Sequence, residues 1–406
     1  MKYIVLVGDG MADRPIKKLG YKTCLQKAHT PNMDKIAAEG IAGRLRTIPQ
    51  GFAPGSDVAN LSIFGYNPSR HFSGRAPIEA AYRGIKLLKR DVAFRCNLVT
   101  LKFLNSGKMN TAIMQDYSSG HITTNESKFI IKDINKKLGT NKIALYPGIS
   151  YRHIMVWKNG KKNIRCTPPH DITGEKIRKH LPHGDGEEVL RTLMERSTEI
   201  LMSHPVNRKR IKRGLSPANS LWFWGQGTRL PLPKFKERYN LKGAVISAVD
   251  LIKGLGICAG FDVVTVRGAT GYLDTNFIGK AKAALRALDK VDIVYLHVEA
   301  PDEAGHNGDI KSKIKAIEDF DSKVVGTVLK GIKKFKKYSI LLLPDHATPI
   351  SVKSHTDEPV PFAIYGNTRH KGVKTKIKSF SEDICKARNI RVFEKGYKLM
   401  DYFIKG

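Results

Sequence analysis

Two apolar runs in the C-terminal third of the chain each lead into an acid that is followed by histidine. The runs are residues 291–298 (VDIVYLHV) and residues 338–343 (YSILLL). The acids and histidines beyond them are Asp302 and His306 after the first run, and Asp345, His346 and His355 after the second. A short apolar run that ends in Gly, Pro and acids is typical of a buried strand. Because ligands of open α/β sheets bind beyond the carboxyl ends of the strands, the sequence predicts a site of carboxylates and imidazoles there.

Similar runs alternate with helical patterns over most of the 406 residues. We expect strands at 2–7, 244–248, 262–266, 291–298 and 338–343, and helices that begin at Pro31 or span 58–64, 250–256, 277–288 and 310–332. This alternation predicts an α/β fold with a mostly parallel sheet flanked by helices. Residues 91–229 read differently, as strands of a mixed sheet with loops rich in Pro, His and Gly. The simplest organisation is one discontinuous domain, 1–90 plus 230–406, with an inserted α+β domain at 91–229.

Three of the predicted strand ends supply acids, namely Asp9, Asp302 and Asp345. In a parallel sheet all three lie on the same edge. His306 follows Asp302 by one helical turn, so both side chains can reach one point. The mixture of carboxylates and imidazoles exceeds what one ion needs and suits two divalent ions of the Mn, Zn, Co or Mg type. Two such ions close together favour phosphoryl transfer, because they hold the attacking and leaving oxygens in line.

Ser56 is the candidate nucleophile. It follows a loop that contains Pro54 and Gly55 and stands where a helix begins, so backbone N–H groups would face an incoming phosphate. A serine hydroxyl needs activation, which a metal ion can provide. The alternative is an ordinary N-cap at Ser56-Asp57. Asp9 could likewise cap a turn, and His306 and His355 could be surface histidines.

The formal net charge is +33, with 70 Lys and Arg against 37 Asp and Glu. It is compatible with a solvated basic surface, with attraction of a small anionic substrate, or with nucleic-acid binding. The densest basic cluster, residues 207–213, is short and no nucleic-acid motif accompanies it, so we predict no nucleic-acid partner. No segment reaches the roughly 18 apolar residues of a membrane span. Five scattered cysteines without a C-x-x-C pair favour a reducing, cytoplasmic location.

An ordered set of motifs resembles one known family nearly from end to end. The motifs are VGDGM at 7–11, HTPNMD at 29–34, PGSDVAN at 54–60, SAVDLIK at 247–253, EAPDEAGH at 299–306, LPDHATP at 343–349 and then His355. With these motifs the chain resembles the archaeal type of cofactor-independent phosphoglycerate mutases, which belong to the alkaline phosphatase superfamily. The resemblance implies an alkaline-phosphatase-like sheet and an enzyme of the isomerase class.

The resemblance also implies roles for individual residues. Asp302, His306 and His355 would hold one divalent ion, and Asp9, Ser56, Asp345 and His346 the other. Ser56 would take the phosphoryl group from 3-phosphoglycerate as phosphoserine, and the 2-hydroxyl of the bound glycerate would take it back. This is a step of glycolysis and gluconeogenesis, and it would need no 2,3-bisphosphoglycerate. Lys253 would stabilise charge on the phosphate, and the inserted domain would close over the glycerate and exclude water.

Contacts to the carboxylate or phosphate of the substrate are expected from basic and polar residues that could equally have ordinary surface roles. The candidates are Arg70, Arg75, Arg95, Arg152, His153, His170 and Asp171. The family hints at a homo-oligomer, although the sequence has no interface signature. Two other functions remain open. A metal-dependent phosphatase would share the same ligands, and a nucleic-acid-binding protein would use the positive charge without a metal.

Overall fold

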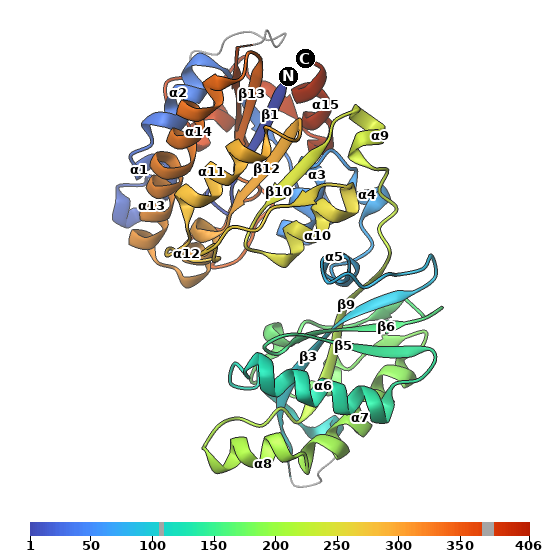
Figure 1. Cartoon of the computed structure of the whole chain (residues 1–406). Helices are drawn as coiled ribbons and strands as arrows, with labels where there is room; N and C mark the ends of the chain where they lie inside the picture. The colour runs from blue at the N-terminus through green and yellow to red at the C-terminus, as the bar shows by residue number, and fades with distance from the viewer. Residues whose placement is uncertain (105–108, 368–376) are drawn as a thin grey trace. The chain divides into compact units, whose positions relative to one another are not determined.

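The computed structural model describes residues 1–104, 109–367 and 377–406. The chain divides into two compact units, residues 1–72 with 231–406 and residues 73–230 (Figure 1). The second unit begins earlier than the expected boundary at residue 91. The reason is helix α5 (Ala76–Tyr82), whose Ala76 and Ala80 pack on Ala93, Ile154 and Val156 of the second unit.

The first unit contains an eight-stranded sheet in the order β11–β10–β12–β1–β13–β14–β2–β15. Its strands are β1 Lys2–Gly8, β2 Ile41–Leu45, β10 Gly243–Ile246, β11 Asp262–Val263, β12 Ile293–Val298, β13 Tyr338–Leu343, β14 Val360–Gly366 and β15 Arg391–Phe393. Strand β1 lies between β12 and β13 and is parallel to both, and β10 and β11 continue this parallel arrangement. Strand β14 is antiparallel to both of its neighbours. The mostly parallel sheet predicted from the alternation is therefore confirmed.

Helices lie between the strands of this sheet in sequence. They are α1 Cys24–Lys27, α2 Pro31–Glu39, α3 Ser56–Ile63, α4 Pro68–His71, α9 Phe235–Tyr239, α10 Asp250–Ala259, α11 Phe277–Ala287, α12 Ala300–Asn307, α13 Ile310–Asp319, α14 Gly326–Gly331 and α15 Leu399–Lys405. The helix expected over 310–332 is interrupted by a π-helical segment, Phe320–Val325. Within it, buried Asp321 accepts a hydrogen bond from the backbone N–H of Met33 in α2, at 2.7 Å. No helix of the described residues is both long and apolar enough to cross a membrane.

Alternation along the central strands assigns their side chains to two layers. Ile4 and Leu6 of β1 join a buried core with residues of α2, α11, α13 and α14, helices that Figure 1 shows grouped beside the sheet. Tyr295 of β12 pairs with Val5 and stacks on Phe64, directly after α3, at a ring distance of 4.1 Å. Every residue of β12 and β13 is buried, as expected for strands covered on both faces.

The second unit is α+β. Its antiparallel sheet joins β4 (Ile113–Asp116), β3 (Val92–Lys102), β6 (Arg152–Trp157) and β5 (Ile143–Ile149), with β9 (Ser220–Thr228) paired to β3. A small two-stranded sheet consists of β7 (Ile164–Arg165) and β8 (His183–Gly184). Beside α5, the helices are α6 Thr124–Leu138, α7 Glu187–Met202 and α8 Pro205–Lys212. Apolar residues of β3, α6, α7 and β9 form a core of their own.

Candidate metal centre and active site

Three strand ends of the first unit converge at one edge of its sheet. Asp9 follows β1, Asp345 follows β13, and Asp302 lies in the first turn of α12, which follows β12. The backbone between them is close, since the Gly10 N–H donates to Asp345 Oδ1 at 3.1 Å. Gly10 has a φ of +60°, and a Cβ atom there would meet Asp302 Oδ1 at 2.5 Å, so only glycine fits. The expected convergence of the three acids is confirmed.

One cluster of ligands forms around Asp302. His306 Nε2 lies 3.2 Å from Asp302 Oδ2, His355 Nε2 lies 3.5 Å from Asp302 Oδ1, and the two histidine Nε2 atoms are 3.0 Å apart. The hydrogen bond to Asp302 raises the pKa of His306 to about 9. Burial opposes ionisation of Asp302, but the surrounding histidines hold its pKa well below the usual value. An anionic carboxylate flanked by two imidazoles has the composition of a divalent-metal site.

A second cluster forms around His346. Its Nε2 atom lies 3.4 Å from Asp9 Oδ1 and 3.5 Å from Asp345 Oδ2. Burial lowers the pKa of His346 to about 4, so the ring is neutral at physiological pH. Its Nδ1 atom lies 3.2 Å from the hydroxyl of Thr348, which donates to Asp302 Oδ1 at 2.5 Å. Nδ1 therefore carries the proton, and the lone pair of Nε2 is directed at the acids, as a metal ligand requires.

His346 of the second cluster also lies beside the first. Ligand atoms of Asp9, Asp345 and His346 lie within 4.8 Å of one another, and so do those of Asp302, His346 and His355. The ring centroids of His346 and His355 are 4.1 Å apart.

The donor set fits cations. Asp9 Oδ1 is buried and has no hydrogen-bond partner within the part of the chain that the structure describes. Burial, and then the nearby charges of Asp345 and Asp302, raise the pKa of Asp9 well above its usual value. A bound cation would satisfy the orphaned oxygen and relieve the repulsion among the three acids.

Ser56 is the first residue of α3, and its Oγ atom lies 3.0 Å from His346 Nε2. The N-cap position is Gly55, and no side-chain cap bond is formed there, so the alternative of an ordinary N-cap at Ser56 is wrong. The hydroxyl instead reaches the second cluster.

Asn60, one turn further along α3, was missed by sequence reasoning. Its side-chain amide donates to the Ser56 carbonyl at 2.8 Å and to Asp345 Oδ2 at 2.7 Å, and it accepts from the Tyr295 hydroxyl at 2.5 Å.

His297 was also missed, because it lies inside an apolar run and resembles a core residue there. It is fully buried, with Nδ1 3.2 Å from Glu299 Oε1 and Nε2 3.4 Å from Asp9 Oδ2. Burial alone would lower the pKa of His297, but the neighbouring carboxylates of Asp345 and Glu299 raise it to about 9. Nε2 of His297 has no hydrogen-bond partner among the described residues.

Comparisons with known proteins show the family to which the chain belongs. Residues 37–207 match the family model of 2,3-bisphosphoglycerate-independent phosphoglycerate mutase. The chain is 50% identical, over the full length of both proteins, to a probable mutase of this kind from Geobacter sulfurreducens. It is 55% identical to one from Methanosarcina acetivorans, over 90% of each chain. The chain belongs to the 2,3-bisphosphoglycerate-independent phosphoglycerate mutase family. The resemblance and enzyme class expected from the motifs are thereby confirmed.

A solved structure extends the agreement to the fold of this mutase family member. A protein from Pyrococcus horikoshii is 33% identical and superimposes with a TM-score of 0.81, covering 100% of this chain and 98% of that one.

Two further expected site residues lie in the first unit. Lys253 is the fourth residue of α10 and forms an ion pair with Asp250 at 3.3 Å. Its side chain is 14% exposed. Arg70, in α4, is exposed.

Within the second unit of the mutase, some of the predicted substrate residues gather around Glu79. This buried carboxylate pairs with Arg75 and Arg95, each at 3.2 Å, and the Arg95 guanidinium lies 4.0 Å from the ring centroid of Trp224. The ring of His170 packs edge-on against Trp224 at 5.2 Å. Nearby arginines lower the pKa of Glu79 against the effect of burial, and burial lowers that of Arg95 to about 10. Two guanidinium groups against one carboxylate leave a local excess of positive charge.

The remaining predicted residues have separate environments. Arg152 is exposed beside Tyr151, with its guanidinium 5.4 Å from that ring, and Asp171 is an exposed neighbour of His170. His153 is buried, and its Nδ1 atom accepts a hydrogen bond from the Gly148 N–H at 2.9 Å.

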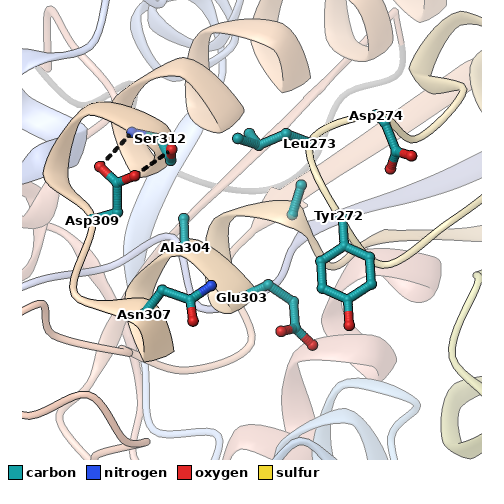
Figure 2. A pocket seen from close by; sticks show the side chains of 9 residues that line it. Tyr272, Leu273, Asp274, Glu303, Ala304, Asn307, Asp309 and Ser312 are labelled. Carbon is teal, nitrogen blue, oxygen red and sulfur yellow. Dashed lines mark hydrogen bonds between the residues drawn. The ribbon is translucent and has the colours of Figure 1, made fainter. Parts of the chain in front are cut away.

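Helix α12 also borders a cavity of about 330 Å³, whose lining side chains are drawn in Figure 2. The cavity is lined by Tyr272, Leu273, Asp274, Ala300, Glu303, Ala304, Asn307, Asp309 and Ser312. The residues of α12 in this set share one helical face, whereas Asp302 and His306 lie on another. The cavity is therefore not the metal centre.

Proposed function

We propose that this enzyme interconverts 3-phosphoglycerate and 2-phosphoglycerate through a phosphoserine at Ser56, with two divalent ions of the Mn, Co, Zn or Mg type. The observation that carries the proposal is the contact of Ser56 Oγ with His346 where two carboxylate–histidine clusters meet. Asp302, His306 and His355 would hold one ion, and Asp9, Ser56, Asp345 and His346 the other. When bound, the ions would lower the pKa of the serine hydroxyl and neutralise phosphate charge.

The residues of the chain supply orientation for this chemistry. Ser56 Oγ gives up its proton and attacks the phosphorus, the bond to the 3-oxygen of the glycerate breaks, and that oxygen takes up a proton. The 2-hydroxyl then gives up its proton and attacks phosphoserine, the bond from phosphorus to Ser56 Oγ breaks, and Oγ takes up a proton. Asn60 fixes the first turn of α3 against Asp345, so the nucleophile keeps its direction. Lys253 is proposed to stabilise phosphate charge together with the N–H groups at the start of α3.

The second unit is proposed to be the substrate-closing domain. Arg75 and Arg95 share one carboxylate, Glu79, and so retain positive charge for a carboxylate or phosphate of the substrate. The other proposed contacts are Arg70, Arg152, His153, His170 and Asp171. Retention of glycerate and exclusion of water would make the enzyme a mutase rather than a phosphatase. The five free cysteines suit a reducing compartment, so we place the reaction in cytoplasmic glycolysis and gluconeogenesis.

The test is an assay of the metal-loaded enzyme with 3-phosphoglycerate and Mn²⁺, without 2,3-bisphosphoglycerate, in which 2-phosphoglycerate and inorganic phosphate are both followed. We expect mostly 2-phosphoglycerate. Mostly phosphate would reject the mutase and favour a phosphatase at the same site. A strict need for 2,3-bisphosphoglycerate would reject the proposed route.

Ser56→Ala tests the nucleophile. We expect it to abolish turnover and to remove the acid-stable phosphate label that the wild-type enzyme acquires from labelled substrate. Ser312→Ala, on the cavity face of α13, is the matched control and should keep both. An active Ser56→Ala enzyme would overturn the phosphoserine step.

A further inference from the structure

A fully buried lysine stands behind the metal-ligand acids. Lys280 of α11 has no exposed surface, and its Nζ atom lies 3.0 Å from Glu299 Oε2. Moving an ammonium group out of water is costly unless it is paired, and a well-packed apolar pair is often as stable as a buried ion pair. A contribution to fold stability is therefore a weak explanation for this pair.

Glu299 is held from several sides. Its Oε1 atom accepts hydrogen bonds from the Ser247 hydroxyl at 2.5 Å and from the backbone N–H groups of Ala248 and Val249 at 3.1 Å each. These partners follow β10, whereas Glu299 follows β12, so the carboxylate joins two neighbouring strand ends. With Lys280 on its other oxygen, Glu299 has little freedom to rotate.

The fixed carboxylate of Glu299 orients His297. Nδ1 of His297 lies 3.2 Å from Glu299 Oε1, and Nε2 lies 3.4 Å from Asp9 Oδ2 and 3.8 Å from Asp345 Oδ2. The ring is thus placed between the fixed acid and the two carboxylates of the second cluster. The Lys280 ammonium group, the Glu299 carboxylate and the His297 ring therefore follow one another behind Asp9 and Asp345.

The Asp302 carboxylate of the other cluster has different side-chain partners. The Asp302 carboxylate is surrounded by Thr348, His306 and His355, and its contact with Thr348 Oγ1 is 2.5 Å. Among the described residues, the Asp302 carboxylate makes no hydrogen bond or ion pair with the side chains of Lys280, Glu299 or His297. The backbone N–H of Asp302 does donate to the Glu299 carbonyl, at 3.0 Å, where α12 begins.

We propose that Lys280, Glu299 and His297 are positioning residues that hold Asp9 and Asp345 for one ion, the ion of the Asp9–Asp345–His346 cluster. The inference rests on the proposed function in that it requires two ions. Partners that orient ligating groups typically contribute a factor of about 10 to 100 in metal affinity. The effect is expected at one cluster and not at the other, which separates positioning from general stabilisation of the unit.

The experiment titrates Mn²⁺ into the chelator-treated, full-length chain by calorimetry, without substrate. Wild type is compared with His297→Leu, with Lys280→Met, and with the rescue variants His297→Gln and Lys280→Arg, which restore a donor or a cation. Asn32→Ala is the control, because Asn32 bonds buried Asp321 in the same unit through an amide hydrogen bond of 2.8 Å. Ser247→Ala removes a single hydrogen bond to Glu299 and serves if the other variants do not fold.

We expect two sites in wild type and in Asn32→Ala. In His297→Leu and Lys280→Met, one site should weaken by about tenfold or more while the other stays within about twofold, and the rescue variants should recover part of the loss. Ser247→Ala should weaken the same site to a smaller extent. Unchanged affinities, an equal loss at both sites, or a single site in wild type would overturn the inference. A selective loss of metal affinity at one site, in a protein that makes no 2-phosphoglycerate, would instead reject the proposed function and leave the positioning role of the three residues standing.

Discussion

His153 provides a stability prediction that can be worked out from its surroundings. The imidazole is 1% exposed in β6, and its Nδ1 atom accepts the Gly148 N–H at 2.9 Å. Its Nε2 atom has no hydrogen-bond partner among the described residues. Burial, and then the charge of Arg83, lower the pKa of His153 from 6.5 to about 3. The substitution to test is His153→Asn, because an asparagine Oδ1 can accept the same backbone hydrogen bond without titrating.

The direction in which stability changes with pH follows from the pKa values of His153 in the unfolded and the folded chain. Between pH 6.5 and 3 the unfolded chain binds a proton at His153 that the folded chain does not, so stability is complete above 6.5 and falls as the pH falls. Each pH unit in this window corresponds to about 1.4 kcal/mol. The free energy of unfolding should therefore lose about 2 kcal/mol by pH 5 and up to about 5 kcal/mol by pH 3 through this residue alone. The His153→Asn variant should not show this part of the fall in unfolding free energy at low pH.

The assay is urea unfolding followed by tryptophan fluorescence. All three tryptophans, Trp157, Trp222 and Trp224, lie in the second unit, so the signal reports the unit that contains His153 and not the metal clusters. We expect the difference in unfolding free energy between wild type and His153→Asn to be constant above pH 6.5. It should shift by about 2 kcal/mol in favour of the variant at pH 5. A difference that stays constant from pH 7.5 to 5 would refute the reasoning.

Three further predictions concern the proposed reaction. Asn60→Ala should lower kcat by about 10- to 100-fold, because the start of α3 loses its hydrogen bond to Asp345. Steady-state kinetics measures the loss, and circular dichroism checks that the fold is retained. Arg95→Lys should raise KM for 3-phosphoglycerate by about tenfold and change kcat less. An ammonium group cannot stack on Trp224 and at the same time donate two parallel hydrogen bonds to an anion, as a guanidinium can. Treatment with a chelator should abolish turnover, and Mn²⁺ should restore it. Activity that survives in metal-free buffer would contradict the assigned ligands.

Much of the first unit could be predicted because its signals are local. The runs that became β12 and β13 are buried at every residue, and this follows directly from their uninterrupted apolar sequence. Parallel pairing of β1 with both strands then places Asp9, Asp302 and Asp345 at one edge. The i,i+4 spacing of Asp302 and His306 predicted a contact, and the side chains meet at 3.2 Å.

The features that sequence reasoning missed depend on contacts between distant segments. A histidine inside the apolar run of β12 resembles a core residue, and its role emerges only when Asp9 and Glu299 are seen at either side of the ring. Lys280 has the sequence environment of an ordinary surface lysine in an amphipathic helix, yet it is fully buried. The second compact unit begins at Ser73 rather than at residue 91, and the pattern of α5 does not reveal which sheet its alanines cover.

The structure also changes how the net charge of +33 is interpreted. The densest basic run, residues 207–213, is not a uniform charged surface. Asn207 and Arg210 are buried, and Arg210 bonds Glu126 at 2.8 Å and the Ser119 carbonyl at 2.7 Å. Part of that run therefore holds α8 in place, which weakens the argument for a nucleic-acid surface. Around Glu79, by contrast, two arginines share one buried acid. A small anion is the partner that this local excess fits, because a carboxylate or phosphate matches the forked geometry of a guanidinium.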